Sequence, residues 1–547
     1  MSEGTQPARP ADELELDTRT DSDADFASPR SFLTLDKSGG ASERTVGGAA
    51  SPSSSGLGSG YRSGEDSLPD AQPGSAHSLE SNRQPTGDAD AASRGQTEML
   101  RRALSNAEAS SSPRSEDGRD PSSRSWRAQP KHVFILSSAG KPIFTRHGDE
   151  NALAGLMAVA QALVSFLKDR GDQLISARAG KHQLVVLERG PLLLVAASML
   201  GEPIQVLSLH LELLHGQIVS ILTRAFERRF QRDPGFDART LLGGTSSVLK
   251  ALLHTCETDP SSLMQAFAAL PLPAAIRHAA LVPLHAAVKA AGAVFGVLLA
   301  GNLVVALAQS RANPLHPLDL LLLTNFVTAN GSFRQSESFS PVCLPRFNSS
   351  GFLHAYINYI HEDADLCMVL LAAQPDAFFR LSEAGQQLTA ELQAAGAIQA
   401  VCEAAAGQEG GGRLRLQSVP ASAGGGEFGQ ASLLHFVYKY PSRSQFVSPA
   451  FHAPLDNPSD QQSIMQAYSH AQAILFRHAE DGPQLGLPPH RTCFERGSKC
   501  CLLAYVGAEY EIYAAFHCLM DKAAAARTCH RLCVWLKSRQ NDLFAAI

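Results

Sequence analysis

The sequence SSAGKP at residues 137–142 is the stretch of this chain most like a phosphate-binding loop. Such a loop needs a leading glycine for its tight turn and a Ser or Thr after the lysine to hold magnesium. Here the leading glycine is absent and Pro142 follows Lys141. A hairpin turn in which Gly140 supplies a positive φ explains every residue of the segment. The sequence therefore argues against nucleotide hydrolysis.

The late cysteines are the best candidates for metal ligands. Cys529 and Cys533 are four positions apart, which places both on one face of a helix, and His530 lies between them. Four further cysteines are nearby in the sequence: Cys493, Cys500, Cys501 and Cys518. A structural zinc site needs four ligands and usually shows a CxxC pair, which this region lacks. Because Cys500, Cys518 and Cys533 alternate with large apolar residues, we expect these three to be core thiols.

Other catalytic groups have no recognisable pattern in the sequence. There is no GxSxG nucleophile motif, and no cysteine lies in a local pattern that activates a thiolate. The Asp and Glu residues are spread singly along predicted helices and turns, so they form no catalytic pair. We predict a protein without catalytic residues, cofactor or metal.

Four arginines end a predicted long helix over residues 204–229: Arg224, Arg228, Arg229 and Arg232. Cations are favourable at a helix C-terminus, and such a cluster is also able to face an anionic lipid surface. A solvated helix face is the alternative interpretation.

Residues 1–125 hold 25 serines but only three aromatic residues, Phe26, Phe32 and Tyr61. They carry 21 Asp and Glu against 13 Lys and Arg, a net charge of −8, which leaves about +2 of the total −6 for the rest. Too little apolar surface is present to offset the entropy of ordering, so we predict a disordered lead over residues 1–128. The near-neutral remainder argues against nucleic-acid binding.

The elements that position these residues belong to soluble domains rather than to a membrane or secreted protein. The first residues, MSEGTQPARP, lack the pattern of a secretory signal, and the ten cysteines form no regular framework, which favours the cytosol. Residues 290–310 are uncharged and long enough to cross a bilayer, which is one alternative. Gly301-Asn302 between two β-branched runs instead favours a buried hairpin.

The first folded unit reads strand, strand, helix, three strands and two helices. The predicted strands cover residues 132–137, 142–146, 173–178, 182–188 and 191–198, and the later helices 204–229 and 236–255. Asp149 is the expected N-cap of the first helix. Its apolar positions, which we expect to face the sheet, recur every three or four residues: Leu153, Leu156, Val159, Leu163 and Leu167.

The same order recurs, which indicates a repeated module, although the third copy is poorer because its second strand, near Phe446, is short and interrupted by prolines. The second copy has a hairpin at 294–308, helices at 318–328 and 375–406, and strands at 342–347, 352–360 and 366–373. The third has strands at 433–438, 492–494, 500–506 and 510–518, and helices at 461–478 and 521–538. We predict a first domain over 129–258, a helical connector and second domain over 259–406, a Gly-rich linker over 407–430 and a third domain over 431–547.

The sequence resembles the Mon-one family, the vacuolar fusion proteins with three longin domains. The motifs that carry the resemblance are KHVFILSSAGKPIFTRHGD, HQLVVLERGPLLLVAAS and PVCLPRFNSSGFLHAYINYI, and it extends over residues 131–544. It implies an α+β fold of three longin/roadblock-like domains, each a five-stranded antiparallel sheet with flanking helices, after the disordered lead.

The resemblance also implies a function. A Mon-one protein and its partner, a Ccz-one longin protein, form the guanine-nucleotide exchange factor for a late-endosomal Rab-seven GTPase. The first longin domains of both subunits pair and hold the GTPase open, and the other domains help to place the complex on phosphoinositide-bearing late-endosomal and vacuolar membranes. We expect the GTPase and partner interface to include Lys141, Pro142, Ile143, Phe144, Arg146, Leu153 and Leu156. We expect Arg224, Arg228, Arg229 and Arg232 to face lipid.

Several alternatives remain open at this point. Ile143 and Phe144 are equally explained as sheet core, because a strand buries one of every two neighbours. A longin trafficking adaptor would share the fold without exchange activity, and an α+β enzyme would use the late Cys and His residues. The sequence departs from the family in two places. The family continues past the end, WLKSRQNDLFAAI, into a proline-containing tail, and residues 407–430 are a Gly-rich insertion. Unpaired longin edges lead us to expect a subunit that needs its partner for stability.

Overall fold

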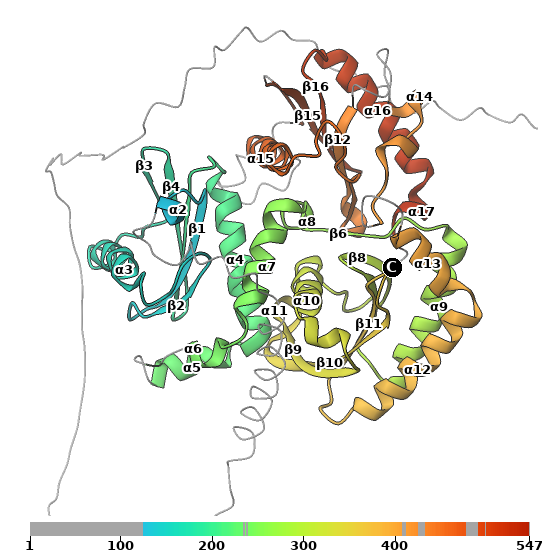
Figure 1. The fold of residues 1–547 in the computed structure, drawn as a ribbon, viewed down its shortest axis with the longest axis horizontal. Coiled ribbons are helices and arrows are strands. Elements are labelled where there is room, and N and C mark those ends of the chain that lie inside the picture. The colour runs from blue at the N-terminus through green and yellow to red at the C-terminus, as the bar shows by residue number, and fades with distance from the viewer. Residues whose placement is uncertain are drawn as a thin grey trace, which may run out of the picture. The chain divides into compact units, whose positions relative to one another are not determined.

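The computed structural model describes residues 124–232, 236, 239–406, 412–424, 433–476, 491–497 and 499–545 (Figure 1). Three sheets follow one another along the chain, with the strand orders β2-β1-β5-β4-β3, β8-β7-β11-β10-β9 and β14-β15-β16-β12-β13-β6. The first two sheets have five strands and the third has six. The strand order is the same in each copy, apart from the added β6. The predicted α+β fold of three repeated modules is confirmed.

The first module begins with a hairpin. The Ser137 amide donates to the Lys141 carbonyl (2.8 Å), the Lys141 amide donates to Ser137 Oγ (3.1 Å), and Gly140 has a φ of 77°. The hairpin-turn interpretation of SSAGKP is thus confirmed. Its elements are α2 (Arg124–Arg127), β1 (Lys131–Ser137), β2 (Pro142–Thr145), α3 (Ala154–Lys168), β3 (Ser176–Ala179), β4 (His182–Arg189), β5 (Leu192–Ser198), α4 (Ile204–Leu222), α5 (Ala225–Arg232), α6 (Arg239–Leu242) and α7 (Ser246–Thr258).

The predicted long helix over residues 204–229 is not continuous, because α4 ends at Leu222 and α5 begins at Ala225. Thr223 takes a left-handed φ of 55°, and its Oγ1 accepts a hydrogen bond from the Ala225 amide (3.2 Å), which starts α5. The predicted helix over 236–255 is also divided, into α6 and α7, with Gly244 at φ 84° between them. The arginine cluster therefore lies at the start and on the surface of a short second helix.

The second module confirms the hairpin at Gly301. Residues 290–310 contain the end of α9, a left-handed Gly292 cap and the buried hairpin of β7 and β8, so the membrane-span alternative is wrong. The predicted helix over 375–406 is divided at Gly396. The elements are α8 (Ser261–Met264), β6 (Phe267–Ala268), α9 (Ala274–Ala291), β7 (Phe295–Ala300), β8 (Leu303–Ala308), α10 (Pro317–Thr328), η2 (Gly331–Arg334), β9 (Ser338–Leu344), α11 (Pro345–Asn348), β10 (Ser349–His361), β11 (Leu366–Ala372), α12 (Phe378–Ala394) and α13 (Ala397–Ala405).

The third module begins inside the predicted Gly-rich linker. Residues 407–411 and 425–430 lie outside the described residues, but residues 412–424 do not form a free connection. Leu414, Leu416 and Val419 are buried in the core that α16 covers. The elements are η3 (Leu416–Ser418), α14 (Ala421–Gly424), β12 (Leu433–Tyr440), η5 (Pro441–Arg443), β13 (Gln445–Val447), α15 (Pro458–Leu475), β14 (Thr492–Arg496), β15 (Cys500–Val506), β16 (Glu511–His517), α16 (Lys522–Ser538) and α17 (Gln540–Leu543).

Helix α4 joins the first module to the second. In the described part of the chain it is the one helix long and apolar enough to span a membrane, and most of its residues are buried. One side packs on β1, β4 and β5, and the other side contacts Leu318 and Leu322 of α10 and Cys343 of β9. Asn325 of α10 donates to Gln217 Oε1 of α4 and to the Val248 carbonyl of α7, both at 3.0 Å.

A short strap at residues 266–270 joins the second sheet to the third. Phe267 and Ala268 pair in parallel with β13, and the Leu270 amide donates to the Val304 carbonyl of β8 (2.9 Å). The buried guanidinium of Arg277 donates to the carbonyls of Val305, Leu270 and Asp542. Gln445 of β13 exchanges two hydrogen bonds with the backbone of Ala545 (3.0 and 2.8 Å). Both strands and the last residues of the chain are thereby fixed at one junction.

Buried charges lie where β1 meets α4 and α7. Lys131 Nζ lies 3.0 Å from Glu202, 3.4 Å from Glu257 and 2.9 Å from Nδ1 of His210. Burial, together with Lys131 and Arg146, holds the pKa of His210 well below its usual value, so the neutral ring accepts from Lys131. Burial raises the pKa of Glu257, but Arg146 and Lys131 outweigh burial and lower it. Each buried charge in this cluster therefore has an opposite charge beside it.

We expect Lys131→Met to lower the free energy of unfolding by about 3–5 kcal/mol, because it leaves two buried carboxylates short of a partner. Adding Glu202→Gln removes one of these charges and is expected to restore part of the loss. The measurement is urea unfolding of four proteins: the unsubstituted chain, Lys131→Met, Glu202→Gln and the double variant. Lys168→Met, which breaks the exposed pair with Glu188, is the control and should cost at most about 0.5 kcal/mol. Additive effects of the two substitutions would contradict the coupling.

Asp319 gives a pH-dependent prediction. It is buried on α10, and its carboxylate accepts from the backbone amides of Arg346 and Phe347 at 3.0–3.1 Å. Burial raises its pKa from 3.8 to about 6, although these two amides act in the opposite direction. The folded state therefore binds the proton more tightly, and the contribution of Asp319 to stability falls as the pH rises through this range.

We expect the stability of the unsubstituted chain relative to Asp319→Asn to fall by about 2–3 kcal/mol between pH 4 and pH 7. The measurement is the free energy of unfolding of both proteins across that range. Parallel curves for the two proteins would show that Asp319 does not titrate there.

Candidate functional site

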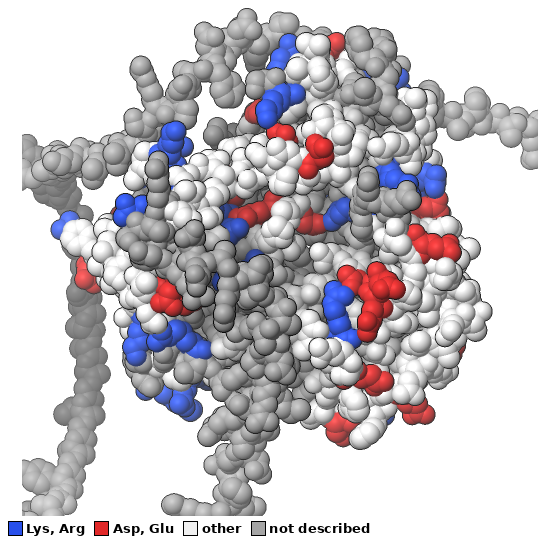
Figure 2. Space-filling model, in the orientation of Figure 1, with Lys and Arg blue, Asp and Glu red and all other residues white. Residues whose placement is uncertain are grey.

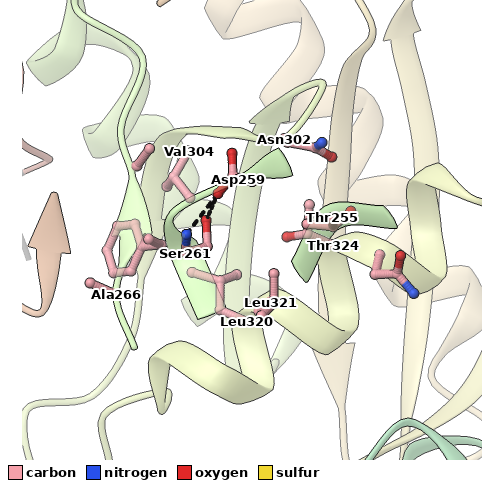
Figure 3. Close-up of a pocket in the computed structure, with 12 residues that line it drawn as sticks. Thr255, Asp259, Ser261, Ala266, Asn302, Val304, Leu320, Leu321 and Thr324 are labelled. Atoms are coloured by element: carbon pink, nitrogen blue, oxygen red, sulfur yellow. Dashed lines mark hydrogen bonds between the residues drawn. The ribbon is translucent and has the colours of Figure 1, made fainter. Parts of the chain in front are cut away.

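The cavity shown in Figure 3 has one charged residue among those that line it, Asp259, and this carboxylate is already paired. It lies among α7, α8, α10 and the β7–β8 turn, and its volume is about 20 Å³, enough for one water molecule. Asp259 accepts from the Ser261 amide (2.8 Å) and from the Ser261 hydroxyl, and it also pairs with Arg413. Through these bonds, Asp259 stabilises the turn between α7 and α8.

The late cysteines do not converge on one point. Cys529 and Cys533 are buried in the core beneath α16, whereas His530 of the same helix is exposed. Burial raises the pKa of the Cys533 thiol to about 12 and that of Cys493 to about 11. Among the described residues, no group of three or more His, Cys, Asp or Glu is placed to hold a metal ion. The core-thiol interpretation is confirmed for Cys533, whereas Cys500 and Cys518 are only partly buried.

The seven predicted interface residues differ in how far the structure buries them. Ile143, Phe144 and Leu153 are buried, as the sheet-core alternative holds for the first two. Arg146 forms two hydrogen bonds with Glu257 (2.5 and 2.7 Å). The residues at the surface are Lys141, Pro142 in part, and Leu156. As GTPase or partner contacts, all seven stay a prediction.

Helix α3 shows an apolar surface that the sequence analysis placed on the wrong side. Leu153, Met157 and Val164 pack on the sheet, against Phe134, Leu136, Val186, Leu193 and Val195. Leu156, Val159, Leu163 and Phe166 instead face away from it, and each is 48–58% exposed. We call these four residues the outer stripe. The error arose because α3 is apolar on two sides, and spacing alone does not tell which side meets the sheet.

The outer stripe is specific to the first module. Helices α10 and α15 occupy the same place in the second and third modules, after the second strand of each sheet. Helix α10 is buried on nearly every side, between the second sheet and helices α4 and α7. Helix α15 packs on the third sheet and contacts α7, and Gln472 donates to the Leu263 carbonyl (2.8 Å). Within the described part of the chain, nothing comparable covers α3.

Charged side chains lie beside the outer stripe. The Arg170 guanidinium lies 4.3 Å from the ring centre of Phe166, and Lys168 pairs with Glu188 (2.7 Å) beside the helix end. An apolar centre with aromatic and arginine residues, surrounded by charges, is typical of interfaces between proteins.

The four predicted lipid-facing arginines lie at the start and on the surface of α5. Arg224 lies 3.9 Å from Glu227, Arg229 lies over the Phe236 ring (5.2 Å), and Arg228 and Arg232 are exposed. Phe226 and Phe230 anchor the opposite side of α5 in the core of the first module. The solvated-face alternative describes their surroundings, and contact with lipid stays a prediction.

Three family models match this chain in order. They are described as the first, second and third longin domains of FUZ, MON1 and HPS1, and they match residues 131–252, 291–390 and 432–540. The first and second matches contain the first and second sheets, and the third match contains the third sheet except β6.

Curated relatives agree with these matches. The chain is 39% identical to a "Vacuolar fusion protein MON1 homolog" of Arabidopsis thaliana, over 78% of this chain and 71% of the relative. It is 36% identical to a protein of the same name from Oryza sativa subsp. japonica (78% and 76%) and 36% identical to "Vacuolar fusion protein MON1 homolog A" of Bos taurus (78% and 74%). With three longin sheets in the same order, and with this identity over most of its length, the chain belongs to the MON1 family.

Proposed function

We propose that this chain is the non-catalytic subunit of a heterodimeric guanine-nucleotide exchange factor for a late-endosomal GTPase of the Rab-seven type. Its partner is a longin protein of the Ccz-one type. The complex acts in endosome maturation, vesicle fusion and protein transport to the vacuole or lysosome. It works from the cytoplasm, recruited peripherally to late-endosomal, prevacuolar and vacuolar membranes that carry phosphoinositide.

The outer stripe of α3 is the observation that carries this proposal. In the second and third modules, the equivalent helix is covered by other parts of the same chain. The first module has the same architecture but leaves four large apolar side chains of this helix about half exposed. Because a covering layer is supplied wherever the module recurs, we infer that a separate chain supplies it for α3. A longin domain that presents its own equivalent helix fits this surface.

The edge strand β3 gives the partner a second point of attachment. It is the last strand of the first sheet, and three of its four residues are exposed. Unpaired strand edges associate readily with other chains. Strand and helix pairing together bury more surface than either contact alone and favour an obligate complex.

Nucleotide exchange requires no catalytic side chain on this protein. An exchange factor needs only to bind the nucleotide-free GTPase more tightly than the loaded one, and linkage then requires that it weakens nucleotide binding. The paired carboxylate of Asp259 in the small cavity and the dispersed cysteines are compatible with such a role. The remaining alternative is a longin adaptor that binds the same partners without exchange activity.

The first test is the assembly of the complex. We expect Val159→Asp with Leu163→Asp to weaken the complex with a co-expressed Ccz-one-like protein at least about 100-fold, because two charges would be buried in an apolar contact. Dissociation constants measured by light scattering or interferometry give the result. Leu519→Asp is the matched control, since Leu519 is 83% exposed in the third module. An unchanged affinity in the α3 variant would exclude the outer stripe as the interface.

The second test is release of fluorescent GDP from the Rab-seven-type GTPase. We expect acceleration by the heterodimer and not by this chain alone, because the GTPase surface is proposed to span both subunits. The rate of GDP release is measured with each subunit, with the complex and with the α3 variant. A stable heterodimer on phosphoinositide vesicles that leaves the rate unchanged would favour the adaptor.

A further inference from the structure

The outer stripe of α3 has the spacing of a contact between two helices. Its members recur at intervals of three, four and three residues: Leu156, Val159, Leu163 and Phe166. Such alternating intervals are those of the a and d positions of a heptad, whose side chains pack into the gaps of a facing helix. The element that meets this surface is therefore expected to be a helix with large apolar side chains at the same spacing.

The residues beside the stripe allow a second helix to approach closely. Gly155 and Ala162 are exposed and seven positions apart, and a Cβ placed on Gly155 would have no neighbouring atom within 4 Å. Residues 154–167 contain no charged side chain. Accordingly, the visible surface over α3 in Figure 2 is mainly white, which marks uncharged residues. Two copies of this helix would thus meet without like-charge repulsion along the stripe.

Along the chain, charged residues follow and precede the stripe beyond its two ends. Arg170 follows it, with the guanidinium 4.3 Å from the ring centre of Phe166. Helical periodicity puts Arg170 in line with the stripe, whereas Asp169 lies to one side. Asp149 and Glu150 precede the stripe, and Asp149 is exposed and Glu150 partly exposed. In an antiparallel pair of these helices, Arg170 of each copy lies beside the acidic residues of the other, whereas a parallel pair brings the two Arg170 side chains together.

We propose that the outer stripe is also the contact surface of a homodimer, in which α3 of a second copy of this chain packs antiparallel on α3 of the first. A two-fold axis at the level of residue 161 brings Leu156 of each copy against Phe166 of the other. The same axis brings Val159 of each copy against Leu163 of the other. Each contact then occurs twice, as two-fold symmetry requires, and a helix with the matching spacing is supplied by the chain itself.

The homodimer is expected to be weak. Four half-exposed side chains from each copy form a contact below the roughly 1,200 Å² of stable specific interfaces, so we expect a dissociation constant on the order of 10 μM. Homodimer and heterodimer use the same surface and exclude each other, a consequence that rests on the proposed function. Self-association then covers the apolar surface of subunits that have not met their partner.

The first test measures self-association of the full chain in the absence of any partner. Analytical ultracentrifugation at concentrations from about 1 to about 200 μM should show a monomer–dimer equilibrium. Leu163→Asp should weaken it at least about tenfold, because a charge would be buried in the apolar contact twice in each dimer. Leu519→Asp, which changes an 83% exposed residue of the third module, is the control and should have no effect.

A chain that is monomeric at all these concentrations, or equal losses in the two variants, would overturn the homodimer. Neither result bears on the heterodimer, because its assembly is measured separately with the co-expressed partner. Failure of the heterodimer to form would in turn leave the self-association data unchanged.

The antiparallel orientation is tested by a reciprocal exchange of charge. Arg170→Glu alone and Glu150→Lys alone should each weaken self-association at least about fivefold, because each places like charges together twice. An equimolar mixture of the two variants should recover the original affinity, since the two substituted side chains then attract one another and the two unsubstituted ones do the same. No recovery in the mixture would overturn the proposed arrangement.

Hydrogen exchange separates a second copy from an occupant within the same chain. Exchange at residues 154–168 should slow as the concentration rises through the dissociation constant, because the helix is covered only in the dimer. Protection that is equal at every concentration would show that another part of the same chain covers the stripe, and it would overturn the proposal.

Discussion

The apolar face of a sheet must be covered by other residues. When the covering helix is apolar on both sides, a further element must cover its outer face as well. That constraint explains the arrangement of the three modules. Helix α4 covers the first sheet on one side and packs on α10 on the other, and α15 extends the same contact to α7. The second and third modules are thereby completed within the chain. Helix α3 is different, because its outer apolar face is exposed and no described element covers it.

Local signals in the sequence were sufficient for the modules themselves. Gly140 and Gly301 marked two hairpins, and short apolar runs between Gly, Pro and charged residues marked most strands, because turn geometry and strand burial are local properties. The breaks at Thr223 and at Gly243-Gly244 were missed. Thr223 takes a left-handed conformation that its residue type does not favour, and its neighbour Arg224 donates to Ser349 in another module. The local sequence around Thr223 gives no signal for a contact with a residue so far away in the chain.

The candidate site was less predictable than the fold, for the same reason. Spacing identified α3 as apolar but not which side meets the sheet, and strand alternation left Ile143 and Phe144 open between core and surface. The pairing of Arg146 with Glu257 joins residues 111 positions apart, so the sequence around Arg146 does not predict it. Surfaces made from several elements require the tertiary structure.

The junction around Arg277 and Gln445 has a practical consequence. Ala545 is fully buried and bonded to Gln445 through both its amide and its carbonyl, and Asp542 accepts from Arg277. A fluorescent protein or affinity tag fused directly after residue 547 would therefore pull on the contact that joins two sheets. The same label placed ahead of residue 124 would avoid this contact. Cell biologists who follow this protein by microscopy should thus label its N-terminal side.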